Sequence, residues 1–119
     1  MIAARTLIAA MLAAALGGAR AAVWIKGAQG SSCEAVCASR SGCSEEEWPN
    51  SEEEFLKVVE QAGHECVSTQ EGGANYDPST DGRHCGWKGP DDDSGEARCS
   101  VAGDEGTYRF CPCNSEREL

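Results

Sequence analysis

The sequence has little positive charge and, beyond residue 21, no long apolar run. Lys and Arg together number 10 against 20 Asp and Glu, which gives a net charge of −10. Such a surface repels phosphate backbones and anionic lipids, so nucleic-acid binding is disfavoured. A membrane-spanning helix needs about 18 or more consecutive apolar residues. We therefore expect no membrane span in the mature chain.

Motifs for catalysis and for metal binding are missing as well. No serine–histidine–acid set, phosphate-binding glycine loop or sugar-hydrolysing pair of carboxylates stands out, so neither a catalytic residue nor a cofactor is predicted. Zinc sites typically contain C-x2-C pairs. None accompanies His64 and His84, and we predict no metal.

One segment imitates the start of a calcium loop. Asp77–Gly82 has oxygen-bearing side chains at positions 1, 3 and 5 and glycine at position 6. Position 12 is Lys88, although a bidentate glutamate is needed there. A turn or loop is therefore favoured, and a looser calcium site that includes Asp91–Asp93 stays open as an alternative.

The N-terminus has the pattern of a secretory signal peptide. Arg5 precedes the apolar run Leu7–Leu16, and small residues follow at Ala19 and Ala21. We predict a signal peptide over residues 1–21 and a single cysteine-rich domain over 22–119, with its core at about 31–113. A buried core helix is the alternative. Eight cysteines, an even number in a secreted chain, predict four disulfides.

The first and last cysteine pairs have spacings that match each other. In a helix, Cys33 and Cys37 would lie on one face about 5–6 Å apart. In a strand, Cys111 and Cys113 would point the same way at a similar separation. Two adjacent disulfides could therefore fasten the end of the chain to its first helix. Eight cysteines can pair in about 105 ways, and spacing alone does not choose among them.

Two helices are predicted. The first covers about Ser32 to Ser39, with Ser31 and Glu34 as a capping box and Gly42 after its last turn. The second covers Ser51 to Ala62 and ends before a glycine. Its apolar stripe has helical spacing and consists of Phe55, Val58, Val59 and Ala62.

Short strands complete the predicted fold. Val23–Ile25 is expected to be an edge strand, His64–Val67 a short strand, and Tyr108–Cys113 the final strand. Between them, residues 68–98 are rich in Gly, Asp, Ser and Pro, which predicts loops with one short hairpin around Cys85 and Trp87. The expected class is a small disulfide-rich α+β fold, with two short helices, a few short strands and a long Gly/Asp-rich loop.

The cysteine frame resembles a known protein region. It resembles the C-terminal cysteine-rich region of the mannoside β-1,6-N-acetylglucosaminyltransferase V family, Golgi enzymes that add a β-1,6-linked N-acetylglucosamine branch to N-glycans from UDP-N-acetylglucosamine. The resemblance covers about residues 31–113. It is carried by Ser32-Cys33, Cys37, Cys43, Phe55, Cys66, Tyr76-Asp77-Pro78, His84-Cys85, Cys99 and Cys111-Pro112-Cys113.

The resemblance implies a disulfide pairing and a role. The implied pairs are Cys33–Cys111, Cys37–Cys113, Cys43–Cys99 and Cys66–Cys85. The catalytic lobes of that family span several hundred residues, which a chain of 119 residues cannot contain. We therefore expect a non-catalytic accessory module that binds a protein or glycan partner. Participation in N-acetylglucosaminyl transfer is one alternative, and thiol–disulfide exchange through Cys111 and Cys113 is another.

Aromatic side chains are the candidate ligand contacts. Trp87, Trp48 and Tyr76 could stack on sugar faces, and Trp87 in its Gly-flanked loop is expected to be the most exposed. Core packing is the alternative for each tryptophan, Trp24 included, and is the favoured one. The expected location is outside the cell or in the secretory lumen, with Golgi or endoplasmic reticulum possible. The terminal Glu118-Leu119 resembles a retention signal or belongs to an ordinary solvated tail.

Overall fold

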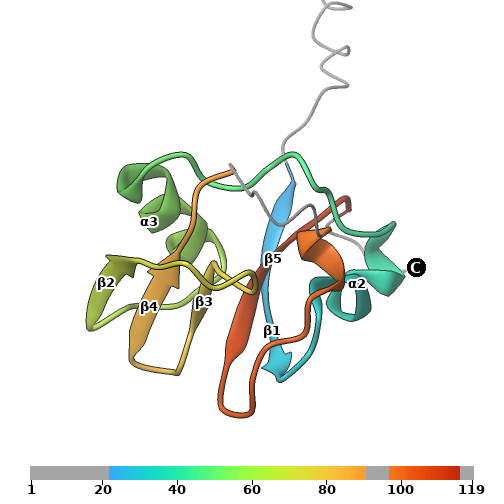
Figure 1. The fold of residues 1–119 in the computed structure, drawn as a ribbon. Helices are drawn as coiled ribbons and strands as arrows, with labels where there is room; N and C mark the ends of the chain where they lie inside the picture. The colour runs from blue at the N-terminus through green and yellow to red at the C-terminus, as the bar shows by residue number, and fades with distance from the viewer. Residues whose placement is uncertain (1–21, 91–96, 116–119) are drawn as a thin grey trace, which may run out of the picture.

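The computed structural model describes residues 22–90 and 97–115, which form a five-stranded sheet with two α-helices (Figure 1). The predicted signal peptide, Asp91–Asp93 and Glu118-Leu119 lie outside the described residues. The sheet has the strand order β1-β5-β3-β4-β2. The elements are β1 Val23–Gln29, α2 Cys33–Val36, the 3-10 turn η2 Ala38–Arg40, α3 Glu52–Gln61, β2 Ser68–Glu71, β3 Ser79–Thr80, β4 His84–Trp87, the 3-10 turn η3 Arg98–Ser100 and β5 Tyr108–Cys113. The predicted small disulfide-rich α+β class is confirmed.

Strand β5 connects the two halves of the sheet. It runs antiparallel to β1, with Cys111 opposite Ile25, and antiparallel to β3 on its other side. β3 and β4 form the predicted hairpin, and β2 pairs in parallel with β4 at one edge. β1 is the other edge, as predicted. There the backbone N–H of Trp24 donates to Oε1 of Gln61 at 3.0 Å, so α3 covers part of this edge.

The strand predicted at 64–67 is wrong. The backbone N–H of His64 donates to the carbonyl of Val59 at 3.1 Å, so this residue still completes the C-terminal turn of α3. Strand β2 begins only at Ser68, where its parallel pairing with His84 starts. The short-range pattern missed this boundary because the helix end uses the backbone groups that a strand would need.

Helix α3 follows its sequence signals closely. Ser51 is the N-cap, and its side chain accepts from the backbone N–H of Glu54 at 3.2 Å. The Glu54 carboxylate reaches back to the N–H of Asn50 at 2.8 Å, one residue before the position expected for a capping box. Gly63 ends the helix with φ +77°. The predicted stripe is confirmed, because Phe55, Val58 and Val59 are buried and Ala62 packs against the core.

Helix α2 is shorter than predicted. It covers only Cys33–Val36 and continues as η2. Its cap is Ser32, whose Oγ accepts from the N–H of Ala35 at 3.1 Å, so the capping box expected from Ser31 is wrong by one residue. The N–H of Ser31 donates instead to the carbonyl of Ala28, in the turn that follows β1. After η2 the chain passes through a left-handed Ser41 with φ 66°.

Four disulfides join distant parts of the chain. Cys33–Cys111 and Cys37–Cys113 lie side by side between α2 and β5, with Cα–Cα distances of 5.2 and 5.1 Å. These four cysteines are fully buried. The helix-to-strand geometry expected from the two spacings is therefore present. The other pairs are Cys43–Cys99 and Cys66–Cys85. All four pairs coincide with those that the family resemblance implies.

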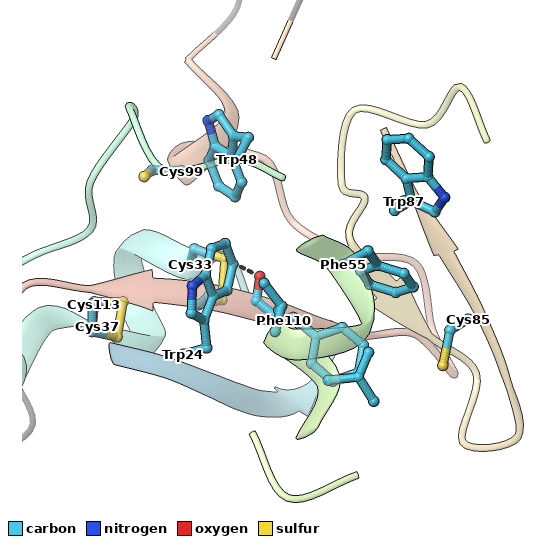
Figure 2. Packing of buried hydrophobic residues seen from close by; sticks show 13 residues of the cluster. Trp24, Cys33, Cys37, Trp48, Phe55, Cys85, Trp87, Cys99, Phe110 and Cys113 are labelled. Carbon is cyan, nitrogen blue, oxygen red and sulfur yellow. Dashed lines mark hydrogen bonds between the residues drawn. A yellow bond between two sulfur atoms is a disulfide. The ribbon is translucent and has the colours of Figure 1, made fainter. Parts of the chain in front are cut away.

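One part of the apolar core lies between α3 and the sheet (Figure 2), and another, the two disulfides between α2 and β5, belongs to the same buried cluster. The Phe55 ring centroid is 6.0 Å from that of Phe110 on β5 and 6.5 Å from that of Trp87 on β4. Trp24 and Trp48 meet edge to face at 6.1 Å. All three tryptophans are buried, so core packing is confirmed and the expected exposure of Trp87 is wrong. The side chain of Trp87, only 7% exposed, faces Phe55 because residues alternate along β4 and His84 and Gly86 take the opposite face.

Two buried arginines bind the backbone of the long loop. Arg109 on β5 is fully buried and Arg98 in η3 is 2% exposed. Both side chains donate to main-chain carbonyls. Arg109 donates to the carbonyls of Tyr76, Arg98 and Val101 at 2.8, 2.6 and 2.6 Å. Arg98 donates to the carbonyls of Asp77, Lys88 and Gly89 at 2.6, 3.1 and 2.8 Å. These contacts satisfy backbone groups that no strand pairs.

An aromatic ring offsets part of the cost of burying the two charges. The guanidinium carbons of Arg98 and Arg109 lie 4.4 and 5.8 Å from the centroid of the Trp48 ring. Cation–π attraction of this kind strengthens as the charge loses water. Burial and the neighbouring Arg98 lower the pKa of Arg109 to about 10, so Arg109 is still charged at neutral pH.

The substitution Arg109→Lys should destabilise the fold strongly. A lysine keeps the charge but cannot donate from Nε and Nη1 at once, so at least one of the three buried carbonyls loses its donor. Each such loss costs about 1–3 kcal/mol. We expect the free energy of unfolding, measured by urea denaturation with the disulfides intact, to fall by about 2–4 kcal/mol. The control Arg83→Lys, at an exposed position, should change it by less than about 0.5 kcal/mol. Equal urea midpoints for the two variants would contradict the role assigned to Arg109.

Candidate functional site

A polar groove lies on the face of the sheet that turns away from α3. It has a volume of about 370 Å³. The paired strands β2, β4 and β3 form its floor. In their register, Ser68 lies opposite His84, and Gln70 lies opposite Gly86. Gly86 also lies opposite Ser79 of β3. Alternation along each strand directs these residues to one face and Cys85 and Trp87 to the other. The wall is the loop after β2, which includes Tyr76 and Asp77.

A buried carboxylate lies at the base of this groove. Asp77 is 5% exposed, and its Oδ1 accepts from the Ser79 hydroxyl at 2.9 Å. Two glycines make room for it. A Cβ at Gly72 would lie 2.7 Å from Oδ2, and a Cβ at Gly86 would lie 3.2 Å from Oδ1. Burial raises the pKa of the Asp77 carboxyl, while the hydrogen bond from Ser79 opposes this rise. The carboxylate fixes the loop against the sheet.

The rim of the groove carries an exposed hydrogen-bonded pair. Ser68 Oγ lies 2.8 Å from Nδ1 of His84. Asp81 lies beside the pair, and its Oδ1 accepts from the backbone N–H groups of Arg83 and His84 at 2.8 Å each. These amide donors lower the pKa of Asp81. Ser68 and His84 are 16 residues apart and meet only because β2 and β4 pair in parallel, so no local pattern in the sequence could have indicated this pair.

The structure separates the three predicted ligand contacts. Tyr76 lines the groove, whereas Trp48 and Trp87 lie in the core. Partial burial and the neighbouring Asp104 raise the pKa of the Tyr76 phenol, which therefore stays protonated at neutral pH. Aromatic stacking on tryptophan is consequently not available in this groove. The groove offers hydroxyl, amide, imidazole and carboxylate groups instead.

The segment that imitates a calcium loop forms other structure. Asp77 is buried beneath the groove, Ser79 and Thr80 form β3, and Asp81 caps the turn into β4 with its side chain. The favoured turn or loop is therefore close to the observed hairpin. The possible contribution of Asp91–Asp93 lies outside the described residues.

The cysteines are all paired. All eight positions lie within the described residues, and none is a free thiol. Cys111 and Cys113 are fully buried in disulfides with α2, so an attacking thiolate cannot reach them in the folded domain. Multiple disulfides indicate an oxidising, secretory or extracellular environment. Within 22–90 and 97–115, no helix has the length and hydropathy needed to cross a membrane.

Neither a protein-family model nor a curated protein matches the chain. The family resemblance noted from the cysteine frame therefore stays a prediction. The groove has to be interpreted from its own chemistry.

The close contact between Gly72 and Asp77 can be tested with a neighbouring control. Gly72→Ala places a methyl group against the buried carboxylate, and we expect a loss of about 1–3 kcal/mol in the free energy of unfolding. Gly73→Ala meets no atom within 4 Å and should be neutral or slightly stabilising. Thermal denaturation of the two variants measures both effects. If Gly72→Ala is as stable as Gly73→Ala, the carboxylate is not held as described.

Proposed function

We propose that this protein is a non-catalytic, disulfide-linked module that binds a glycan in the groove over β2, β3 and β4. The observation that carries the proposal is the convergence of Gln70, Tyr76, Ser79 and His84 on one open, polar depression. Its volume falls in the range typical of small-ligand sites, about 300–1,000 Å³. Sugar hydroxyls both donate and accept hydrogen bonds, and the groove offers partners of both kinds.

The charge of the groove favours a neutral ligand over an anionic one. Asp77 and Asp81 are among its lining residues, and the lining formed by described residues contains no Lys or Arg. Phosphate and carboxylate ligands usually require such cations. A neutral saccharide avoids this requirement, as would an uncharged peptide segment.

The family resemblance supports a place in N-glycan biology. A module similar to the accessory region of an N-glycan-branching enzyme would act on, or next to, glycoproteins in the Golgi or endoplasmic reticulum, or after secretion. Participation in β-1,6-N-acetylglucosaminyl transfer would then need catalytic lobes, which lie outside these 119 residues. The buried position of Cys111 and Cys113 argues against thiol–disulfide exchange through these residues.

A protein partner is the second candidate. Two large apolar side chains, Leu56 within α3 and Val67 just before β2, are 47% and 62% exposed. Exposed apolar side chains can contribute to sites of protein association. Neither side chain lines the groove, so the two kinds of binding can be tested independently.

Glycan binding can be tested on an array of N-glycans and confirmed by titration calorimetry. We expect Gln70→Ala combined with His84→Ala to weaken binding by about tenfold or more, because two hydrogen bonds of about 0.5–1.5 kcal/mol each are lost. Gln29→Ala, an exposed glutamine on β1, is the matched control and should leave the affinity unchanged. Absence of signal for the unaltered protein on every glycan would refute the proposal.

A further inference from the structure

A second group of side chains lies on the other face of the sheet, and the proposed glycan binding does not use it. A ring nitrogen of His64 and the sulfurs of Cys66 and Cys85 all lie within 4.8 Å of one another. The two sulfurs form a disulfide. His64 follows the end of α3, and Cys85 lies within β4, so two regular elements fix the positions of these donors.

A surface hollow of about 640 Å³ lies beside this disulfide and opens onto His64, Glu65 and Cys66. The two disulfides between α2 and β5 are fully buried by comparison, whereas Cys43–Cys99 is half-buried at Cys43, as Cys66–Cys85 is at Cys66. The Cys66–Cys85 bridge also closes the shortest loop, with a sequence separation of 19 against 56 to 78 for the others. Because this loop is the shortest, breaking its bridge increases the conformational entropy of the unfolded chain less than breaking any of the other three.

We propose that reduction of Cys66–Cys85 by a dithiol creates a zinc site made of Cys66, Cys85 and His64. The dithiol supplies two electrons and two protons and leaves as its own disulfide, and the S–S bond becomes two thiols. Zn²⁺ then displaces the two thiol protons and binds two thiolates and one imidazole. A water molecule or the Glu65 carboxylate completes the four ligands that zinc prefers.

The geometry needs little adjustment. Zinc lies about 2.3 Å from sulfur and about 2.0–2.1 Å from nitrogen, so ligand atoms in a tetrahedral site are about 3.5 Å apart. The present separations are within 4.8 Å. Once the S–S bond is broken, the two sulfurs have to separate by less than about 2 Å. Side-chain rotation can supply a shift of this size without moving β4.

A threonine orients the imidazole. Thr80 Oγ1 donates to the carbonyl of His84 at 2.8 Å and lies 3.5 Å from Nε2 of His64. Because the threonine proton is already used, its oxygen can only accept from Nε2–H of His64. The lone pair of His64 is then on Nδ1 and is available to a metal. Metal-binding histidines typically have a partner of this kind on the second nitrogen.

The test uses the mature protein with its disulfides formed. Limited treatment with dithiothreitol, followed by differential alkylation, should label Cys66 and Cys85 before the other six cysteines. Native mass spectrometry of the partly reduced protein with Zn²⁺ should then show one bound metal, and the fully oxidised protein should show none. Replacement by Co²⁺ should give a sulfur-to-cobalt charge-transfer band.

Two variants separate a zinc site from adventitious thiol binding. His64→Ala should weaken zinc affinity by more than the about 10–100-fold that loss of an outer-shell partner costs. His84→Ala, next to Cys85 but on the opposite face, should leave the affinity unchanged. Near-ultraviolet circular dichroism checks that each variant is folded, and Cys66→Ser with Cys85→Ser should bind no zinc. Equal affinity in His64→Ala and His84→Ala, or earlier reduction of another pair, would overturn the proposal.

Discussion

The two adjacent disulfides between α2 and β5 are the constraint on which the rest of the structure depends. They close loops with sequence separations of 78 and 76, and each is expected to stabilise the fold by about 2–4 kcal/mol. A domain of this size buries too little apolar surface to be stable by a wide margin. Once β5 is fixed against α2, it has a defined face for α3 and an edge on which β1 and β3 can pair. Phe110, between Phe55 and His64, joins this covalent framework to the apolar core.

The arginines extend the same framework into the region without regular structure. Arg109 belongs to β5, and its Nε–H donates to the Tyr76 carbonyl. This hydrogen bond fixes the wall of the groove to the central strand. Arg98 does the same for Asp77 from η3, next to the Cys43–Cys99 bridge. Buried charges are costly, and carbonyl dipoles and the Trp48 ring surround these two. The candidate site therefore rests on side-chain-to-backbone hydrogen bonds and only in part on strand pairing.

Local signals in the sequence predicted local structure well. The serine before α3, the glycine after it and the apolar stripe gave that helix to within a residue at each end, and alternation along 108–113 gave β5. The remaining features depend on contacts distant in sequence. The parallel pairing of β2 with β4 creates the groove and the Ser68–His84 pair, and the cover provided by Phe55 buries Trp87. Arginine in a sequence usually indicates an exposed position, so the burial of Arg98 and Arg109 gave no signal that could be recognised beforehand.

The two edge strands of the sheet, β1 and β2, affect how this chain can pair with another copy of itself. Open strand edges invite pairing with another copy and lead to amyloid-like aggregation. On β1, the amide of Trp24 is occupied by the Gln61 side chain, so one donor that a neighbouring strand would need is missing. The opposite edge, β2, is only four residues long, polar throughout and ends in Glu71. Both edges are thus poor templates for strand pairing with another copy of this chain.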